Sequence, residues 1–385
     1  MIDPYAGEAI EGGGRPLGVA GRDGHGGIRG GERPSDLPAE GTTFVAPPGH
    51  TGGRRAPAGP PGLLDGMENL HVAERDLFAL FSIAVLHGEG DEIGTDELLL
   101  ALVRLGVRQD LLDAAGLTRT VAAAVYQGRH ASWASDDRGP VTVLIADGGE
   151  PADVTAAAAD VLRDAHGPDD VLRALLDDPD SRAAEMLATC AVPVPALRDS
   201  LRDGSPLQID DPVPAELHRI RDTLIGRTRY PRYPFWRNPL LALVAPARTN
   251  LAPVPQAWLP LETRQQATER GRRDPGTDDA LLALTAMHEV VAHYPHLYDT
   301  TAGLYDGTAL LAEAGITHAV LRHVADTTEL GTDPTPLNKL PSRHPDDPAT
   351  GWRDTSYLLR RLLAEPGNRA HRLLTNAGFD HVRVR

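Results

Sequence analysis

The chain of 385 residues is long enough for two or three domains, and its hydrophobic content of 41% can supply their cores. Aromatic residues make up only 4%, so these cores consist mainly of Leu, Ala and Val, which favours small, closely packed helices. The formal net charge of −16 argues against nucleic-acid binding as the main function. The single cysteine excludes an intrachain disulfide and fits a reducing cytoplasm. No apolar run approaches the ~18 residues of a membrane span.

The first 65 residues are rich in Gly, Pro and Arg and show little apolar periodicity. A segment of this composition cannot bury enough apolar surface to offset the entropy that ordering would cost. We therefore expect residues 1–65 to form a disordered tail.

Order is expected to begin near residue 70, with a helix over residues 73–87. Apolar side chains recur there with the spacing i, i+3, i+4, i+7 and i+8 of one helical face: Leu77, Leu80, Phe81, Ala84 and Val85. This spacing is typical of an amphipathic helix with one buried side.

The motif GTDELLLAL at residues 94–102 predicts the start of a second helix. Thr95 is a good N-cap residue, and Asp96 and Glu97 lie in the first turn, where carboxylates complement the positive end of the helix dipole. The leucines that follow are expected to be buried.

Shorter elements complete this first part of the pattern. Residues 110–115 are expected to form a helix that ends at Gly116, which can adopt the positive φ of a helix C-terminus. Residues 118–126 predict a further helix. The apolar run VTVLIA at 141–146 is compatible with a strand or a piece of a hairpin, and the Ala-rich residues 153–165 predict another helix.

The same plan then recurs, which indicates internal repeats. The motif returns as GTDDALLAL at residues 276–284, with seven of nine positions identical. A second phrase, LRALLDDPDSRAAEML at residues 172–187, returns as LRRLLAEPGNRAHRLL at residues 359–374, with eight of sixteen positions identical. Chance would give roughly one or two matches in such windows, so the similarity indicates a repeat architecture.

The second half of the chain is expected to follow the first, with two departures. Residues 203–260 are Pro-rich and predict a linker that contains one helix at about 214–225. A helix over residues 263–273 then mirrors the first helix of the chain. An insertion follows the second motif, and a Pro- and Asp-rich loop at 337–354 precedes the last copy at 356–384.

The repeated phrase, G-T-[DE]-x-L-L-L-A-L followed by a leucine pair and a glycine-capped turn, resembles the Clp repeat. That repeat builds the N-terminal domain of Clp-type AAA+ unfoldases of the ClpC and ClpA classes, an all-α unit of two pseudo-symmetric four-helix repeats. The resemblance implies an all-α fold with two such modules in tandem, at residues 66–202 and 261–385, joined by the linker.

The resemblance also implies a binding module without a motor. A P-loop needs G-x-x-x-x-G-K-[ST], and the only lysine, Lys339, lies in PLNKLP, so we expect no ATP hydrolysis, no catalytic residue and no cofactor. Clp N-terminal domains dock protein substrates and adaptors, and some bind phosphoarginine or cyclic-peptide antibiotics. By this resemblance the chain is expected to be a cytoplasmic adaptor, regulator or ligand-sequestering decoy of a Clp protease system. Its expected partners are a protein or peptide substrate, a Clp unfoldase complex or a Clp-targeting cyclic peptide.

In the family, the Thr and the acid of each G-T-E-H turn contact phosphoarginine. Carried over by position, they correspond to Thr95 and Asp96, Pro168 and Asp169, Thr277 and Asp278, and Thr355 and Ser356 in the four copies. Pro168 lacks the hydroxyl and Ser356 lacks the acid. The ligand-contact residues expected from the resemblance are therefore Thr95, Asp96, Asp169, Thr277 and Asp278.

Two other stretches suggest alternative functions. The one from His288 to His296, HEVVAHYPH, suggests a metal-dependent hydrolase, but His288 and His293 are five residues apart, about 140° around a helix, and cannot reach one metal from it. The stretch from Arg227 to Arg237 mixes Arg with aromatic rings, as single-strand nucleic-acid binders do, although the acidic total charge opposes this. We expect no metal site and no nucleic-acid or membrane partner.

Overall fold

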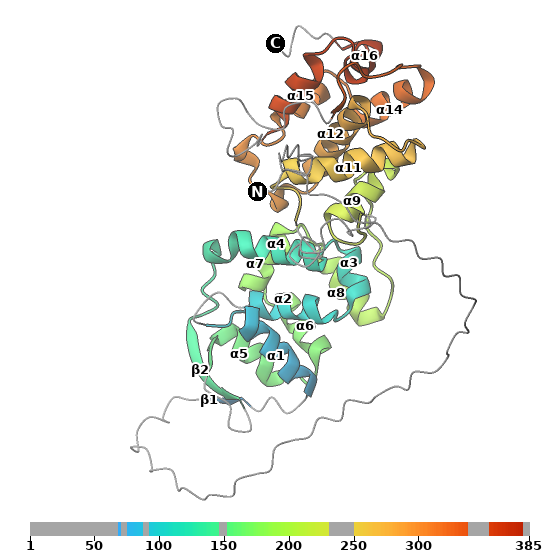
Figure 1. Ribbon diagram of the computed structural model, residues 1–385. Coiled ribbons are helices and arrows are strands. Elements are labelled where there is room, and N and C mark those ends of the chain that lie inside the picture. Colours follow the sequence, from blue (N-terminus) through green and yellow to red (C-terminus); the bar gives the residue numbers. More distant parts are fainter. Residues whose placement is uncertain are drawn as a thin grey trace, which may run out of the picture. The chain divides into compact units, whose positions relative to one another are not determined.

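The computed structural model describes residues 68–70, 75–87, 92–145, 152–230, 250–337 and 354–379. These residues belong to one compact unit. The predicted tail, the aromatic stretch from residue 231 onward and nearly all of the predicted loop at 337–354 lie outside the described residues. The described part is mostly helical, as predicted, with one small sheet (Figure 1).

The elements alternate between helices and short turns along the whole described chain. Up to residue 230 the helices are α1 (Arg75–His87), α2 (Thr95–Leu105), α3 (Gln109–Ala114), α4 (Arg119–Arg129), α5 (Ala156–Asp164), α6 (Pro168–Asp177), α7 (Arg182–Thr189), α8 (Val194–Asp203) and α9 (His218–Leu224), with 3-10 turns η1 (His130–Ser132) and η2 (Ala215–Leu217). From residue 250 they are α11 (Pro255–Glu269), α12 (Thr277–Ala292), α13 (Asp306–Glu313), α14 (His318–Thr327), α15 (Thr355–Leu363) and α16 (Arg369–Asn376), with η4 (Pro295–Leu297) and η5 (Thr300–Ala302).

A three-stranded sheet fixes the start of α2. Its strands are β1 (Glu68–Leu70), β2 (Pro140–Ile145) and β3 (Ala152–Thr155), with β2 in the middle, parallel to β1 and antiparallel to β3. Ile93 extends this pairing, because its N–H donates to Asp153 O and its carbonyl accepts from Thr155 N, both at 2.9 Å. The motif therefore starts directly from the edge of β3.

Two predicted helix boundaries are wrong. The helix expected over 153–165 begins only at Ala156, because residues 152–155 pair with β2. The helix expected over 263–273 begins at Pro255, inside the predicted linker, and ends at Glu269. Proline at the first helical turn costs little because its missing N–H would have no helical partner. Trp258, which is fully buried, packs this additional part of α11 into the core.

The motif helices lie at the centre of the core. Their leucines are fully buried, as predicted for the first copy: Leu98, Leu99 and Leu102 in α2, and Leu281, Leu282 and Leu284 in α12. Burial of each such side chain contributes roughly 1.5–3 kcal/mol. Cys190 is also buried, as predicted, and its burial raises the thiol pKa to about 12.

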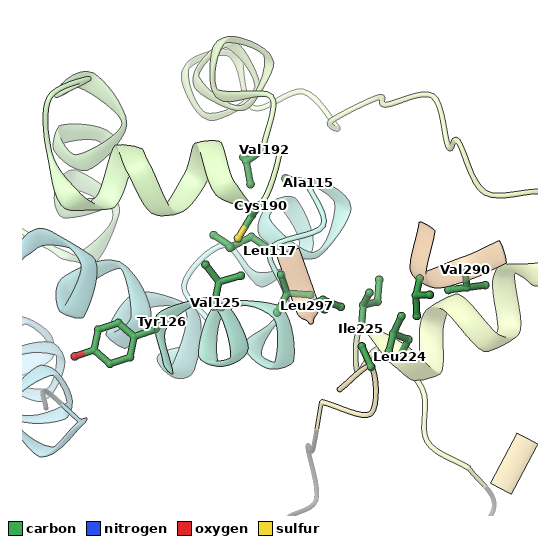
Figure 2. Packing of buried hydrophobic residues seen from close by; sticks show 14 of the residues in the cluster. Ala115, Leu117, Val125, Tyr126, Cys190, Val192, Leu224, Ile225, Val290 and Leu297 are labelled. Carbon is green, nitrogen blue, oxygen red and sulfur yellow. The ribbon is translucent and has the colours of Figure 1, made fainter. Parts of the chain in front are cut away.

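The buried side chains continue across the predicted linker. Figure 2 shows them running from Cys190 past Leu117 and Val125 to Leu297, and on to Leu224 and Val290. The hydroxyl of Thr118 at the start of α4 also donates to the carbonyl of Ile225, directly after α9. The helix predicted near 214–225 is therefore present, and it is packed into the core. Within the described residues no helix has both the length and the apolar character that crossing a membrane requires.

A buried carboxylate attaches α9 and the residues after it to α11. Glu262 of α11 is fully buried and accepts hydrogen bonds from Arg219 Nη1 at 3.1 Å, Tyr230 Oη at 2.7 Å and Gln266 Nε2 at 2.8 Å. Trp258 Nε1 donates in turn to Tyr230 Oη at 2.6 Å. One side chain thus satisfies donors from three separate parts of the chain.

Replacing Glu262 by Ala should destabilise the protein by roughly 2–4 kcal/mol, because Arg219, Tyr230 and Gln266 would lose their common acceptor in the interior. Urea unfolding followed by circular dichroism measures this loss. Glu313→Ala, at an exposed position of α13, is the control and should change stability by less than about 0.5 kcal/mol. Equal stabilities for the two variants would contradict this role of Glu262.

Candidate ligand site at the repeated helix start

The two phrases that recur in the sequence meet in the structure. Thr95, at the start of α2, accepts the N–H of Ala183, at the start of α7, on its hydroxyl oxygen at 2.9 Å. Thr277, at the start of α12, accepts the N–H of Ala370, at the start of α16, at 3.0 Å. Each motif threonine therefore joins its own helix to the helix of the second phrase.

An aspartate from an intervening connector completes each of these joints; Asp137 is fully buried, and the side chain of Asp333 is 7% exposed. Asp137 accepts the N–H groups of Thr95 and Arg182, both at 2.8 Å, and the hydroxyl of Thr95 at 3.3 Å. Asp333 accepts the N–H of Thr277 at 3.1 Å, its hydroxyl at 2.6 Å and the N–H of Arg369 at 2.7 Å. In both copies one carboxylate therefore satisfies the first amides of two helices, where the helix dipoles favour a negative charge.

The predicted N-cap role of Thr95 is wrong, because the N-cap position belongs to Gly94. The hydroxyl of Thr95 is already committed to Ala183 and Asp137. The Gly94 N–H donates instead to Glu97 Oε2 at 2.8 Å, and in the second copy the Gly276 N–H donates to Asp279 Oδ2 at the same distance. The second acid of each motif thus closes the helix start.

The ends of neighbouring side chains pack closely against the glycine at this position. A Cβ atom on Gly276 would lie 1.7 Å from Arg369 Nη2, and one on Gly94 would lie 2.7 Å from Asp96 Oδ1. The backbone at both glycines is extended, so the constraint is the packed side chains and not φ.

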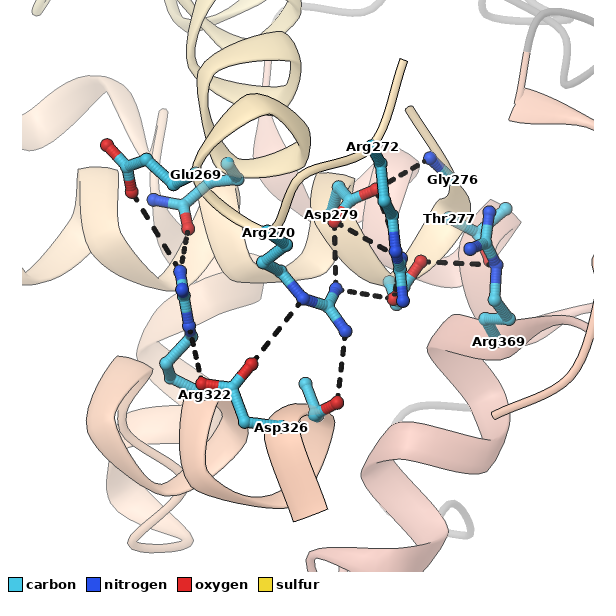
Figure 3. Close-up of polar contacts among 12 residues, drawn as sticks. Glu269, Arg270, Arg272, Gly276, Thr277, Asp279, Arg322, Asp326 and Arg369 are labelled. Carbon is cyan, nitrogen blue, oxygen red and sulfur yellow. Dashed lines mark hydrogen bonds and ion pairs between the residues drawn. The ribbon is translucent and has the colours of Figure 1, made fainter. Parts of the chain in front are cut away.

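In the second copy, arginines of the same chain neutralise the motif acids (Figure 3). Arg270 Nη1 lies 2.6 Å from Asp278 Oδ2 and 2.8 Å from Asp279 Oδ1. Arg272 Nη1 lies 2.6 Å from Asp278 Oδ2, and Arg369 Nε lies 3.2 Å from Asp278 Oδ1. Both aspartates are fully buried, so three guanidinium groups occupy the space that a ligand would need.

In the first copy the corresponding acid is left open. Asp96 accepts the indole N–H of Trp133 at 2.8 Å through Oδ2, and its buried Oδ1 has no hydrogen-bond donor. Asp278 Oδ1 also lacks a donor but lies 3.2 Å from Arg369 Nε, whereas no arginine of the described residues forms an ion pair with Asp96. The side chain is only 1% exposed. It lines a pocket of about 470 Å³ whose other walls are Glu92, Glu97, His130, Pro140, Asp153 and Arg182. The pocket carries four acidic groups against one arginine.

The surroundings of Asp96 raise its pKa. Burial, followed by the neighbouring Glu97, raises the pKa of Asp96 from 3.8 to about 8. With its pKa raised to about 8, Asp96 is largely protonated at neutral pH, so the free pocket holds a proton. A cation entering the pocket would favour the release of this proton.

The different surroundings of the two acid pairs have an identifiable sequence origin. Arg270 and Arg272 stand six and four residues before Gly276, whereas the positions six and four before Gly94 are Gly88 and Gly90. Arg182, the equivalent of Arg369, points instead to Glu92, with a 2.8 Å ion pair. The first copy therefore lacks two of the arginines and has the third directed elsewhere.

The structure does not bring the remaining predicted residue, Asp169, to either acid pair. It lies in the first turn of α6 and forms an ion pair with Arg108 at 2.7 Å, with 40% of its side chain exposed. Thr355 and Ser356 begin α15, where Thr355 is fully buried. Among the predicted ligand-contact residues, Thr95 and Thr277 make structural hydrogen bonds and Asp278 is covered by arginines. Asp96 lines the pocket described above.

Sequence reasoning missed most of this pocket, including Glu92, Asp153 and Arg182, and both bridging aspartates. The only signal was the second recurring phrase, which contains Arg182 and Arg369.

The histidines of the alternative metal site lie on α12 and η4, and Nδ1 of His288 and Nε2 of His296 are buried without partners. Across the described ranges, no three His, Cys, Asp or Glu side chains gather closely enough to hold a metal ion.

Comparison with known proteins found no similar protein. No family model, curated protein or solved structure matches the chain.

Thr95→Val should destabilise the protein by about 1–3 kcal/mol, because the Ala183 N–H then loses its acceptor in the interior. Hydrogen exchange at the Ala183 amide and urea unfolding both report on this contact. Thr277→Val should produce an equivalent effect at Ala370. Thr300→Val, at an exposed position in η5, is the control. Full retention of the Ala183 protection in Thr95→Val would refute the joint described above.

Asp96→Asn should flatten the pH dependence of stability between about pH 4 and pH 8. Because the folded pKa of about 8 exceeds the ordinary aspartate value of 3.8, the stabilisation is complete below about pH 4 and is lost as the pH rises to 8. Asparagine carries no such proton and can donate to Glu97 in its place. Urea unfolding at several pH values should show that the free energy of unfolding of the variant increases relative to that of the native chain as the pH rises. A parallel pair of pH curves would contradict the raised pKa.

Proposed function

We propose that the chain is a non-catalytic protein- or peptide-binding module that takes an arginine side chain of its partner into the Asp96 pocket. Its repeats resemble those of the N-terminal domains through which Clp unfoldases dock substrates and adaptors. The proposal extends this resemblance to a role as an adaptor, regulator or decoy in a Clp protease system.

The observation that supports the proposal most directly is the second copy of the site. There the motif acids Asp278 and Asp279 hold the guanidinium groups of Arg270 and Arg272 at 2.6–2.8 Å. The chain thus contains an example of the group that this acid pair binds. The first copy has the equivalent pair, Asp96 and Glu97, beside an open pocket.

The charge of the pocket favours the same ligand. Four acidic residues line it, and its one arginine is already paired with Glu92. A guanidinium group can donate two parallel hydrogen bonds to a carboxylate, a geometry that lysine cannot reproduce. The buried Oδ1 of Asp96 has no donor of its own, so an incoming guanidinium satisfies it at no cost to an existing contact.

Binding should also release a proton. Asp96 is largely protonated at neutral pH because its pKa is about 8, and a guanidinium favours the ionised form. Affinity should therefore increase with pH until about pH 8 and then level off. Calorimetry in buffers with different ionisation enthalpies would measure the released proton.

The decisive titration uses the full chain with an arginine-containing peptide, the same peptide with citrulline, and the same peptide with phosphoarginine. We expect one arginine-containing peptide to bind per chain and the neutral citrulline peptide to bind at least about tenfold more weakly. Asp96→Asn should weaken arginine binding by a similar factor and remove its pH dependence.

Asp169→Asn is the matched control, because Asp169 occupies the same motif position in the paired copy but forms an ion pair with Arg108 outside the pocket. This variant should bind like the native chain. Stronger binding of the phosphoarginine peptide would extend the family resemblance to the ligand. Equal binding of the arginine and citrulline peptides, or unchanged binding by Asp96→Asn, would refute the proposed site.

A further inference from the structure

A second and larger cleft lies along α4. Its volume is about 1220 Å³, and it is bounded by α4 and the end of α2 on one side and by the segment of η4 and η5 on the other. Helix α4 packs against η4, so both walls belong to the described core. Pockets of roughly this size hold small organic molecules.

The cleft is basic, although the chain as a whole carries a formal charge of −16. Arg104, Arg119 and Arg129 line it. In the part of the chain that the structure describes, no carboxylate lies within ion-pair distance of these three arginines. Asp299 at the rim is the one acidic residue among the lining residues, and the charge of Arg129 contributes to lowering its pKa, after the hydrogen bonds from Thr301. Three cations therefore face one solvent-exposed anion.

Arg119 has a structural role that uses only one of its guanidinium nitrogens. Arg119 Nε donates to the carbonyl of Val103, in the last turn of α2, at 3.1 Å. Its two terminal nitrogens make no other hydrogen bond to described residues. Arg104 makes no hydrogen bond to described residues, and burial lowers its pKa, an effect that the nearby phenol of Tyr126 partly opposes.

Buried polar atoms without partners accompany the arginines. Thr120 is only 4% exposed and its Oγ1 has no hydrogen-bond partner, and Nε2 of His296 on the opposite wall is also buried without one. Such a buried atom is unfavourable unless a ligand or water satisfies it. Burial lowers the pKa of His296, so its ring is neutral at physiological pH and can donate or accept.

We propose that this cleft is a binding site for a small organic molecule that carries a phosphate group. Arg104 and Arg119 hold the phosphate, since guanidinium groups match its geometry and two of them balance its charge of about −2. The remainder of the molecule occupies the space towards His296 and Tyr298, because the cleft is far larger than a phosphate ion requires. This site is independent of the proposed arginine pocket.

The test is isothermal titration calorimetry of the full chain with glucose 6-phosphate, inorganic phosphate and glucose. We expect glucose 6-phosphate to bind with a Kd below about 1 mM and at least about tenfold more tightly than inorganic phosphate, and glucose not to bind. Equal affinity for the two phosphates would overturn the assignment to an organic molecule. Absence of binding by both phosphates would overturn the site.

Variants locate the binding. Arg104→Gln and Arg119→Gln should each weaken glucose 6-phosphate binding at least about tenfold. Arg104 makes no hydrogen bond to described residues, so its substitution leaves the fold intact, and the glutamine at 119 retains a donor for the Val103 carbonyl. Arg173→Gln, at an exposed ion pair on α6, is the control and should bind normally. Unchanged affinity in both cleft variants would overturn the proposal even if the ligand binds elsewhere.

Discussion

A buried aspartate between two helix starts is the constraint on which the candidate site depends. Asp137 holds the first amides of α2 and α7, and Asp333 holds those of α12 and α16. Each carboxylate replaces the water that these amides would otherwise need, and each places a negative charge where two helix dipoles favour it. The motif threonine shares this interaction, so the next residue, the motif acid, is fixed beside the joint. The position of Asp96 follows from this arrangement.

The helices could be predicted from the sequence because their signals are local. Leucine spacing placed α2 and α12, and the glycine with positive φ at residue 116 ended α3 as expected. The bridging aspartates could not be predicted, because they come from connectors of unlike sequence, SDDRG and GTDPT. Asp137 also has a left-handed φ of 51°, which no sequence pattern here required. Only the tertiary contact selects these two aspartates among many.

The same limit explains the wrong N-cap assignment of Thr95 and the position of Asp169 away from the acid pairs. Thr95 has the side chain of an N-cap residue, but its hydroxyl bonds to Ala183, 88 positions away, and a glutamate closes the helix start instead. Asp169 has the right position in the repeat, but Arg108, in the turn between α2 and α3, pairs with it. Position within a repeat therefore predicts where a residue lies along its helix. It does not predict what lies opposite, which decides whether an acid is available to a ligand.

The two copies show two solutions to burying the same pair of acids. The second copy surrounds Asp278 and Asp279 with arginines, so the charges are balanced within the fold. The first copy places no arginine of the described residues in ion-pair contact with Asp96, which retains a proton instead, and this costs stability as the pH rises. A chain selected for stability alone would gain from arginines in both copies, because a paired buried charge is less costly than an unpaired one. The unpaired acid beside an open pocket is thus the feature that packing does not explain, and a cationic partner is the simplest group that would complete it.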